Sequence, residues 1–352
     1  MNTLVFDWGN TLMRIFPQFS GSMSEWPEVE AIPGIIPALD KLYENNKLII
    51  ATSAQDSTAA QVKKALARVG IDKYFQEIFS FEKIGISKDS PNFYTRVAEL
   101  IGENQRPVMI GDDYFKDVCT ATIAGWSAFW YSPNEKPCLA LLPLHLAEVV
   151  KMEELPDQLD NLLLPDYTTA VSWLINNHAN NNLLLHSQTV AAVSYLLSVW
   201  MRNCGHKVDP ILAHRGGLLH DIAKLSERNP NDFEIDHAEL GSRLLMEKQQ
   251  PKLADIARSH LISSLYDEKY QPVTWEQKLV HYADKIVEGA NVVMLEERIQ
   301  AICKRYPHHA ERILGSVSGV KEMQAEICAH LNQSPDRLQK NISAALMGSI
   351  EE

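Results

Sequence analysis

The sequence contains an adjacent histidine and aspartate, His220 and Asp221, inside the otherwise apolar stretch LLHDIAK. Burying an isolated carboxylate among apolar side chains is strongly unfavourable unless it is paired, hydrogen-bonded or bound to a metal. Imidazole and carboxylate together suit borderline divalent metals such as Zn, Fe, Mn or Co, and the two oxygens of a carboxylate can bridge two ions. The pair therefore indicates a metal site on a helix.

Further histidines and aspartates fall in separate amphipathic stretches of the same half of the chain. They are His186, His237, His260 and Asp284. Because each lies in its own predicted helix, all of them can converge on one point in a helical bundle. Taken singly, His237 or His260 would more often be an ordinary core or surface residue, so the prediction depends on the whole set.

The order of these segments resembles the HD-domain superfamily of metal-dependent phosphohydrolases over about residues 170–300. The resemblance implies a basic four-ligand set, formed by His186, His220, Asp221 and Asp284. It also implies that His237 and His260 are the added ligands of the subgroup that binds two metals, which includes symmetrical dinucleoside tetraphosphate hydrolases. Some relatives carry a second histidine directly after the position of His260. Here that residue is Leu261, so a third metal is not expected.

The implied chemistry suits phosphate esters. Two cations a few Å apart activate a bridging water and stabilise charge on a phosphoryl group, so Asp221 would serve catalysis as well as metal binding. Lys224 follows one helical turn later and is a candidate phosphate contact, the alternative being a solvated lysine at a helix end. Arg243 is a weaker phosphate candidate, because a surface arginine on a helix is the commoner arrangement.

A second group of polar residues follows short apolar runs in the first 130 residues. The group consists of Asp7, Thr52, Lys88, Asp112 and Asp117. All are expected just beyond the carboxyl ends of parallel strands, where open α/β sheets place their ligands.

These segments resemble the haloacid dehalogenase (HAD) superfamily over residues 1–160. The resemblance implies that Asp7 is the nucleophile that accepts a phosphoryl group and that Thr52 and Lys88 bind phosphate. It further implies that Asp112 and Asp117 hold magnesium together with Asp7, since magnesium prefers oxygen ligands.

The HAD resemblance has one departure, at Gly9. HAD phosphatases carry an aspartate two residues after the nucleophile, which acts as general acid and base, and Gly9 stands at that position. Since such catalysis typically contributes ~10²–10⁴-fold in rate, we expect this site to be weak or inactive. The short spacing between Asp7 and Thr52 leaves no room for a large cap domain.

The elements that must position these side chains differ between two parts of the chain. Up to about residue 130, short apolar runs alternate with helical stretches, which predicts a parallel sheet covered by helices on both faces. Strands are expected at 4–6, 47–51, 78–80, 107–110 and 127–130, and helices at 35–43, 57–69, 91–101 and 116–124.

Strand signals disappear after Leu164. Amphipathic helical stretches follow at 168–177, 183–203, 209–223, 237–248, 251–263, 274–304 and 320–348. We therefore predict an α/β plus all-α architecture, with a doubly wound parallel sheet in a domain at 1–164 and a helical bundle in a domain at 165–352. The helices after Leu295 are expected to pack on the bundle or to form a contact between copies of the chain, as in a homo-oligomer.

Composition limits the functional classes. Hydrophobic residues make up 45% and charged residues 22% of the sequence, as in soluble globular proteins. The net charge of -12 argues against a general nucleic-acid binder, but not against a small phosphorylated ligand, because a bound cation reverses the local field. The five cysteines form no C-x-x-C pair, which indicates reduced thiols. No secretory signal and no apolar run of bilayer length are recognised, so we expect a cytoplasmic protein without a membrane partner.

We therefore expect a hydrolase that acts on a nucleotide, a dinucleotide or another phosphate ester. A pair of divalent transition metals, Fe, Mn, Zn or Co, is expected in its helical half, and Mg in the HAD-like half. Two alternatives stay open. The same six ligands hold the diiron centre of certain oxygenases, which would take up oxygen without releasing phosphate. A non-catalytic regulator would bind a nucleotide tightly without turnover.

Overall fold

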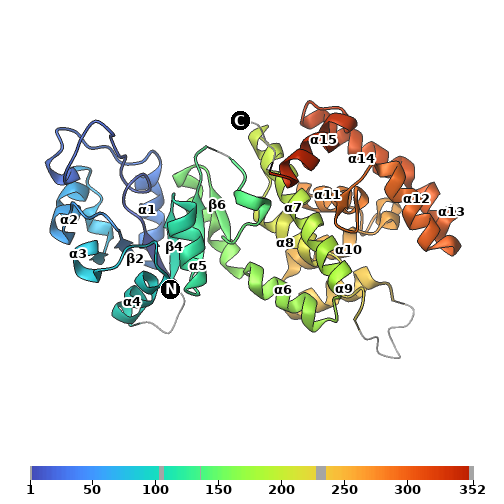
Figure 1. The fold of residues 1–352 in the computed structure, drawn as a ribbon, viewed down its shortest axis with the longest axis horizontal. Coiled ribbons are helices and arrows are strands. Elements are labelled where there is room, and N and C mark those ends of the chain that lie inside the picture. Colours follow the sequence, from blue (N-terminus) through green and yellow to red (C-terminus); the bar gives the residue numbers. More distant parts are fainter. Residues whose placement is uncertain (1, 103–106, 135, 227–234, 349–352) are drawn as a thin grey trace. The chain divides into compact units, whose positions relative to one another are not determined.

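The computed structural model describes residues 2–102, 107–134, 136–226 and 235–348. The chain divides into two compact units, the first formed by Met1–Glu135 with Leu144–Asp166 and the second by Lys136–Pro143 with Tyr167–Glu352. In Figure 1 the first unit, blue to green, contains a sheet with helices, whereas the second, yellow-green to red, is largely helical.

The first unit is built on six parallel strands in the order β3-β2-β1-β4-β5-β6. The strands are β1 (Asn2–Phe6), β2 (Asn46–Ala51), β3 (Glu77–Phe79), β4 (Val108–Gly111), β5 (Ser127–Tyr131) and β6 (Ala147–Val149). The order reverses between β1 and β4, where Phe6 pairs with Ile110. Open α/β sheets bind ligands at this point, beyond the carboxyl ends of the strands.

Helices cover both faces of this sheet, because successive side chains of a strand point to opposite faces. On β1, Leu4 and Phe6 belong to one buried cluster and Val5 to the other. The helices are α1 (Ile35–Tyr43), α2 (Ala59–Arg68), α3 (Phe81–Ile84), α4 (Pro91–Ile101) and α5 (Ala121–Ile123). The predicted parallel sheet with helices on both faces is confirmed, and α1 and α4 have the predicted bounds.

Two details of the first unit differ from the sequence expectation. The strand at 127–130 is not the last, because β6 follows; β6 has only three residues, too few to give a periodic signal. The expected helix at 116–124 begins instead as the π-helix η3 (Tyr114–Thr120) and continues into α5. Asp113 caps η3 by accepting hydrogen bonds from the backbone of Phe115 and Lys116. Wide π turns are frequent at functional sites, and this one carries Asp117.

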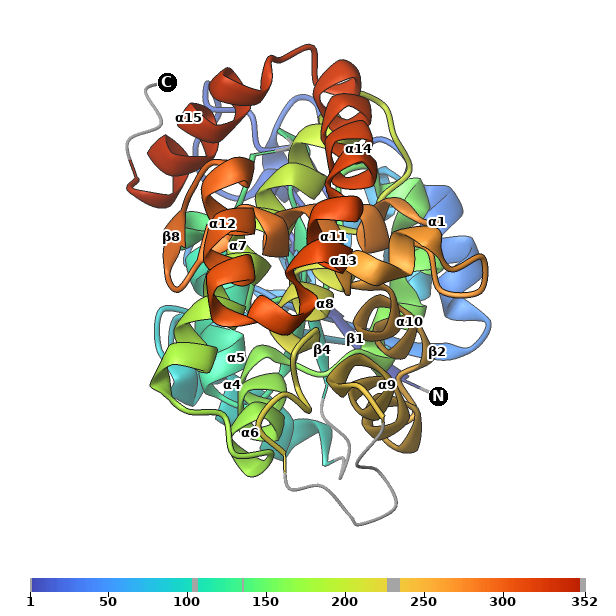
Figure 2. The same ribbon diagram turned by 90° about the vertical axis from the view of Figure 1, so that its right-hand side faces the viewer.

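The second unit is a bundle in which α7 packs against α8 and α11, and α10 packs against α8, α9 and α11. These helices lie close together in Figures 1 and 2. The helices are α6 (Tyr167–Asn176), α7 (Asn181–Asn203), α8 (Pro210–Leu219), α9 (His237–Glu247), α10 (Pro251–Ser259), α11 (Trp275–Lys285), α12 (Leu295–Arg305), α13 (Ala310–Gly315), α14 (Val317–His330) and α15 (Pro335–Leu346).

The prediction of a single helix over 274–304 is wrong. A short antiparallel hairpin, β7 (Val287–Glu288) with β8 (Asn291–Val292), separates α11 from α12. Gly289 turns this hairpin with a φ of 60°, a left-handed conformation that glycine adopts without steric cost. The hairpin brings α12 back toward α11.

Helix α7 also corrects the expectation that no apolar run reaches membrane-spanning length. Among the described residues it is the one helix that is long and apolar enough to do so, but 67% of that stretch is buried inside the protein. It also carries His186 at its buried face, so we interpret α7 as the central helix of the bundle.

Candidate metal centres

Five helices of the second unit bring all six predicted ligands to one place. His186 lies on α7 and Asp284 on α11. His220 directly follows α8 and Asp221 comes next, His237 begins α9, and His260 directly follows α10. We call this set the histidine–aspartate centre. Local sequence explains the helix ends, since Asp236 caps α9 by accepting a hydrogen bond from the backbone of Glu239.

Two carboxylates organise the histidine–aspartate centre. Oδ1 of Asp221 lies 3.1 Å from Nε2 of His237 and 3.3 Å from Nε2 of His260. Oδ1 of Asp284 lies 3.1 Å from Nε2 of His186 and 3.8 Å from Nε2 of His220. Donors bound at ~2.0–2.1 Å around one ion lie roughly 3–3.4 Å apart, so most of these separations suit shared metal ions.

Two triads of potential ligands share His220: one with His186 and Asp284, the other with Asp221 and His260. Among the described residues, Nε2 of His220 and Oδ1 of Asp221 are buried in short ion-pair contacts but make no hydrogen bond of good geometry, an arrangement that costs free energy unless an ion completes it. The other ring nitrogens of His220 and His260 bond backbone carbonyls, at 2.7 and 2.6 Å. This directs Nε2 of each ring toward the centre, as in metal-binding histidines. The residues therefore fit a pair of divalent ions.

Electrostatics in the histidine–aspartate centre favour charged aspartates. Burial opposes ionisation of Asp221, but the charges of His220 and Lys224 hold its pKa well below the usual value. Burial lowers the pKa of His260 to about 4, which keeps this ring neutral near pH 7. Burial likewise lowers the pKa of His220, but the charge of Asp221 outweighs it and the pKa is raised. A bound metal competes with that proton.

The two candidate phosphate contacts of this half differ in position. Nζ of Lys224 lies 2.5 Å from Oδ2 of Asp221, so this lysine is at the centre, and its side chain is 31% exposed. Arg243 is exposed and pairs with Glu239 at 3.0 Å; it lines a different cavity, together with Lys269 and Gln271. The structure therefore brings Lys224, but not Arg243, to the ligands.

Sequence reasoning missed two cations beside Asp284. Lys285 is buried and bonds the Asp284 carboxylate and the carbonyl of His260. Arg298, on α12, bonds the backbone carbonyl and Oδ1 of Asp284, each at 3.2 Å. The sequence did contain one indication of the role of Arg298. This residue falls on the apolar face of α12 together with Leu295 and Ile299, where a charged side chain needs a buried partner.

Arg298→Gln is expected to weaken metal binding about 10–100-fold, the usual cost of removing a group that orients a ligand. The reason is that Asp284 would lose its anchor on α12. Arg305→Gln is the matched control, since Arg305 is 45% exposed and, among the described residues, pairs with Glu288 and not with Asp284. Metal titration of both variants measures the effect. Equal affinities would show that Arg298 does not position Asp284.

The first unit holds a second cluster, which we call the aspartate site. Asp7 directly follows β1 and Asp112 directly follows β4, while Asp117 lies on η3; their carboxylates gather within 4.8 Å. Nζ of Lys88 bonds Asp7 and, at 2.7 Å, Oδ1 of Asp117. Thr52, at the end of β2, is buried and 4% exposed. Oxygen ligands of this kind suit magnesium.

Negative charge dominates the aspartate site. Burial and then the charge of Asp7 raise the pKa of Asp112 to about 6. Burial raises the pKa of Asp117 to about 7, although the charge of Lys88 lowers it. A bound divalent cation would relieve this excess charge.

Gly9 has no side chain that could act as the general acid, which HAD phosphatases carry two residues after the nucleophile. A Cβ built on Gly9 would lie 2.6 Å from Cδ1 of Ile15, so an apolar side chain fills the place of the acid. Thr11 is the nearby hydroxyl that bonds Asp112, at 3.2 Å. The arrangement can bind a cation, but the described residues offer no acid two positions after Asp7.

Lys88→Met is expected to destabilise the first unit by about 3–5 kcal/mol, because it leaves buried carboxylates unpaired. Asp117 has a raised pKa, so its contribution to stability is present at low pH and is lost as pH rises through about 7. The variant should therefore lose more stability at about pH 8 than at about pH 5. Urea unfolding at both pH values measures the free energy of unfolding.

Lys83→Met is the control, because Lys83 forms an exposed pair with Glu77. It should lower the free energy of unfolding by no more than about 1 kcal/mol. An equal loss in both variants would contradict the prediction.

Comparisons with known proteins find one family match in each unit. Residues 6–130 match the family of haloacid dehalogenase-like hydrolases and residues 183–289 match the HD domain. An uncharacterized protein of Methanocaldococcus jannaschii is 30% identical over 38% of this chain and 82% of its own. A pyrimidine 5′-nucleotidase of Streptococcus pneumoniae is 28% identical over 40% of this chain and 58% of its own. Ribonuclease Y of Clostridium novyi is 31% identical over 41% of this chain and 26% of its own.

Fold and sites together define a hydrolase with two metal-binding units. The chain contains a haloacid dehalogenase-like hydrolase domain in residues 6–130 and an HD domain in residues 183–289, and each holds groups that could bind a metal ion. It spans little more than half of the nucleotidase and about a quarter of the ribonuclease.

Proposed function

We propose that the histidine–aspartate centre hydrolyses a phosphate ester of a nucleotide or dinucleotide with two divalent transition metals, Fe, Mn, Zn or Co. The observation that carries the proposal is the pair of ligand triads that share His220. Within them a buried His220 nitrogen and a buried Asp221 oxygen make no hydrogen bond of good geometry to any described residue. Two relatives named for a pyrimidine nucleotide and for RNA support the nucleotide class.

Bound metals would supply an activated water and neutralise charge on the phosphoryl group. The chain's own residues have other tasks in this proposal. Asp221, with two oxygens facing three histidines, holds the ions together. Lys224 is 31% exposed and beside Asp221, so its ammonium group is available to bind a non-bridging phosphate oxygen.

We further propose that the aspartate site binds magnesium and contributes weak or no phosphatase activity. Asp7 is placed to act as nucleophile beside Lys88, but no acid follows at position 9, where the chain has Gly9. The leaving group would therefore depart without a proton donor. A cytoplasmic location and a small phosphorylated partner remain part of the same proposal.

Metal analysis of the purified chain, followed by a phosphate-release screen with Mn, Fe, Co, Zn and Mg, tests the proposed function. We expect close to two transition-metal ions per chain and phosphate release from nucleotides that depends on them. Oxygen uptake with bound iron and no phosphate release would favour an oxygenase. Tight nucleotide binding without turnover under every metal would favour a regulator.

A further inference from the structure

A polar cavity of about 650 Å³ in the second unit lies next to the segments that carry two of the metal ligands. Asp236, which lines it, is bonded directly to His237, so their Cα atoms are ~3.8 Å apart. Ser263 and Ser264, also in its lining, follow His260 by three and four residues. Two chain segments therefore connect the histidine–aspartate centre to the lining of this cavity.

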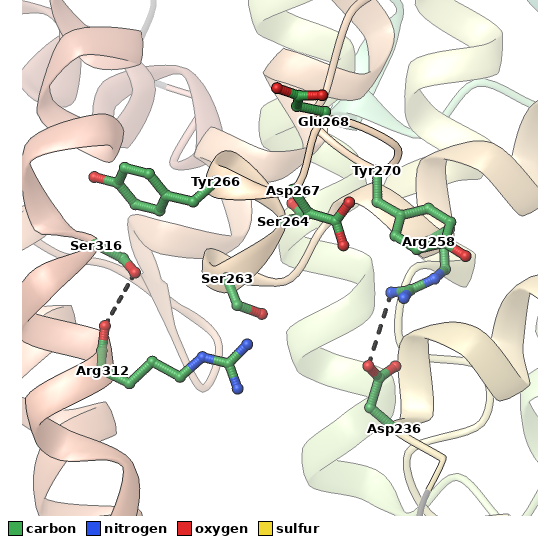
Figure 3. A pocket seen from close by; sticks show the side chains of 10 residues that line it. All are labelled: Asp236, Arg258, Ser263, Ser264, Tyr266, Asp267, Glu268, Tyr270, Arg312 and Ser316. Atoms are coloured by element: carbon green, nitrogen blue, oxygen red, sulfur yellow. Dashed lines mark hydrogen bonds and ion pairs between the residues drawn. The ribbon is translucent and has the colours of Figure 1, made fainter.

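Arg258 lies on one wall of the cavity, and its charge is already balanced. Its guanidinium group lies 2.9 Å from Glu239 and 3.7 Å from Asp236, and it stacks on the Tyr270 ring at 3.7 Å. Figure 3 shows Arg258 directed at Asp236. This wall therefore has no free positive charge for an anionic ligand.

Arg312 lies on the opposite wall, on α13, and its guanidinium group points into the cavity (Figure 3). Its backbone carbonyl accepts a hydrogen bond from Ser316 at 3.0 Å. Among the described residues, its guanidinium group has no ion pair or hydrogen bond. The hydroxyl of Ser263, which lines the same cavity, is likewise unpaired within the described part of the chain. A cation and a hydroxyl donor thus face the same space.

We propose that Arg312 and Ser263 form an anion subsite that binds a second phosphate group of the substrate, distinct from the phosphate held at the histidine–aspartate centre. A guanidinium group matches two phosphate oxygens with parallel hydrogen bonds. The inference rests on the proposed function. The second phosphate is either linked to the first or carried on another carbon of the same molecule, and both have the same chemistry at Arg312.

One acid bears on this subsite. Asp267 lines the same cavity and is exposed, whereas Figure 3 shows Glu268 directed away from Arg312. Oδ1 of Asp267 accepts a hydrogen bond from the backbone of Lys269, which Asp267→Asn preserves. Removing this negative charge should strengthen binding of a second phosphate, since like charges repel across the cavity.

The test compares AMP, ADP and adenosine 3′,5′-bisphosphate as substrates of the metal-loaded full chain. We expect at least one two-phosphate nucleotide to exceed AMP in kcat/KM, and Arg312→Gln to reduce that preference about tenfold, as loss of a charged hydrogen bond does. Asp267→Asn should increase the preference. Arg337→Gln, which changes an exposed arginine of α15 without an ion pair in the described structure, should leave it unchanged.

The outcomes separate the two proposals. A preference for ADP over AMP indicates that the two phosphates are linked, whereas a preference for adenosine 3′,5′-bisphosphate over AMP indicates that they are carried on separate carbons. If wild type and Arg312→Gln show the same preference over AMP, the subsite is overturned. If none of the three nucleotides is hydrolysed, the screen described above decides the proposed function, and calorimetric titration decides the subsite alone. In that case, roughly tenfold weaker binding of a two-phosphate nucleotide to Arg312→Gln supports it, and equal binding overturns it.

Discussion

His220→Ala is expected to lower phosphate release at least about a hundredfold. Catalytic metal ions contribute several kcal/mol to stabilising the transition state, and each 1.36 kcal/mol corresponds to a tenfold change in rate. The physical reason is that His220 belongs to both ligand triads, so its loss affects both ions. Metal content should fall with activity. His220→Gln, which preserves more of the side-chain volume, separates metal loss from a cavity in the core.

Two control variants accompany this experiment. His309→Ala removes an exposed histidine with no role in the centre and should retain activity and metal. Asp7→Asn removes the proposed nucleophile of the aspartate site and should change total phosphate release little. The reverse ranking, with Asp7 essential and His220 dispensable, would assign the hydrolysis to the first unit.

Gly9→Asp combined with Ile15→Ala is expected to raise phosphatase activity of the first unit by about a hundredfold, the lower end of the usual contribution of a general acid. The second substitution is needed because Ile15 occupies the space beside Gly9. Ile15 is 45% exposed, so its truncation should cost little stability. The assay is phosphate release with magnesium in the His220→Ala background, where the histidine–aspartate centre is silent.

The gain should depend on the new carboxylate and on the nucleophile, Asp7. Gly9→Ala with Ile15→Ala relieves the same crowding without an acid and should give no increase. Adding Asp7→Asn should abolish any increase. A failure of the double variant to gain activity, with magnesium bound, would mean that the missing acid is not what limits this site.

Local patterns in the sequence were sufficient for much of the fold. Alternating apolar runs and helices predicted the parallel sheet, because a strand buried on both faces must be apolar throughout. They also predicted the bounds of α1 and α4. The same reasoning missed β6 and the β7–β8 hairpin, whose strands have three and two residues. Such short strands are stabilised by pairing with distant residues, which leaves little trace in local periodicity.

The identity of the candidate ligands follows from the sequence, because an aspartate in an apolar helix needs a partner and each ligand lies in a distinct segment. What the ligands meet depends on contacts between segments far apart in the chain. Arg298 reaches Asp284 from the next helix, Ile15 fills the space beside Gly9, and Arg312 faces a cavity near His237 and His260. The burial and the charge at these places arise only when the helices pack together. Residue type and spacing along the sequence therefore could not predict these contacts.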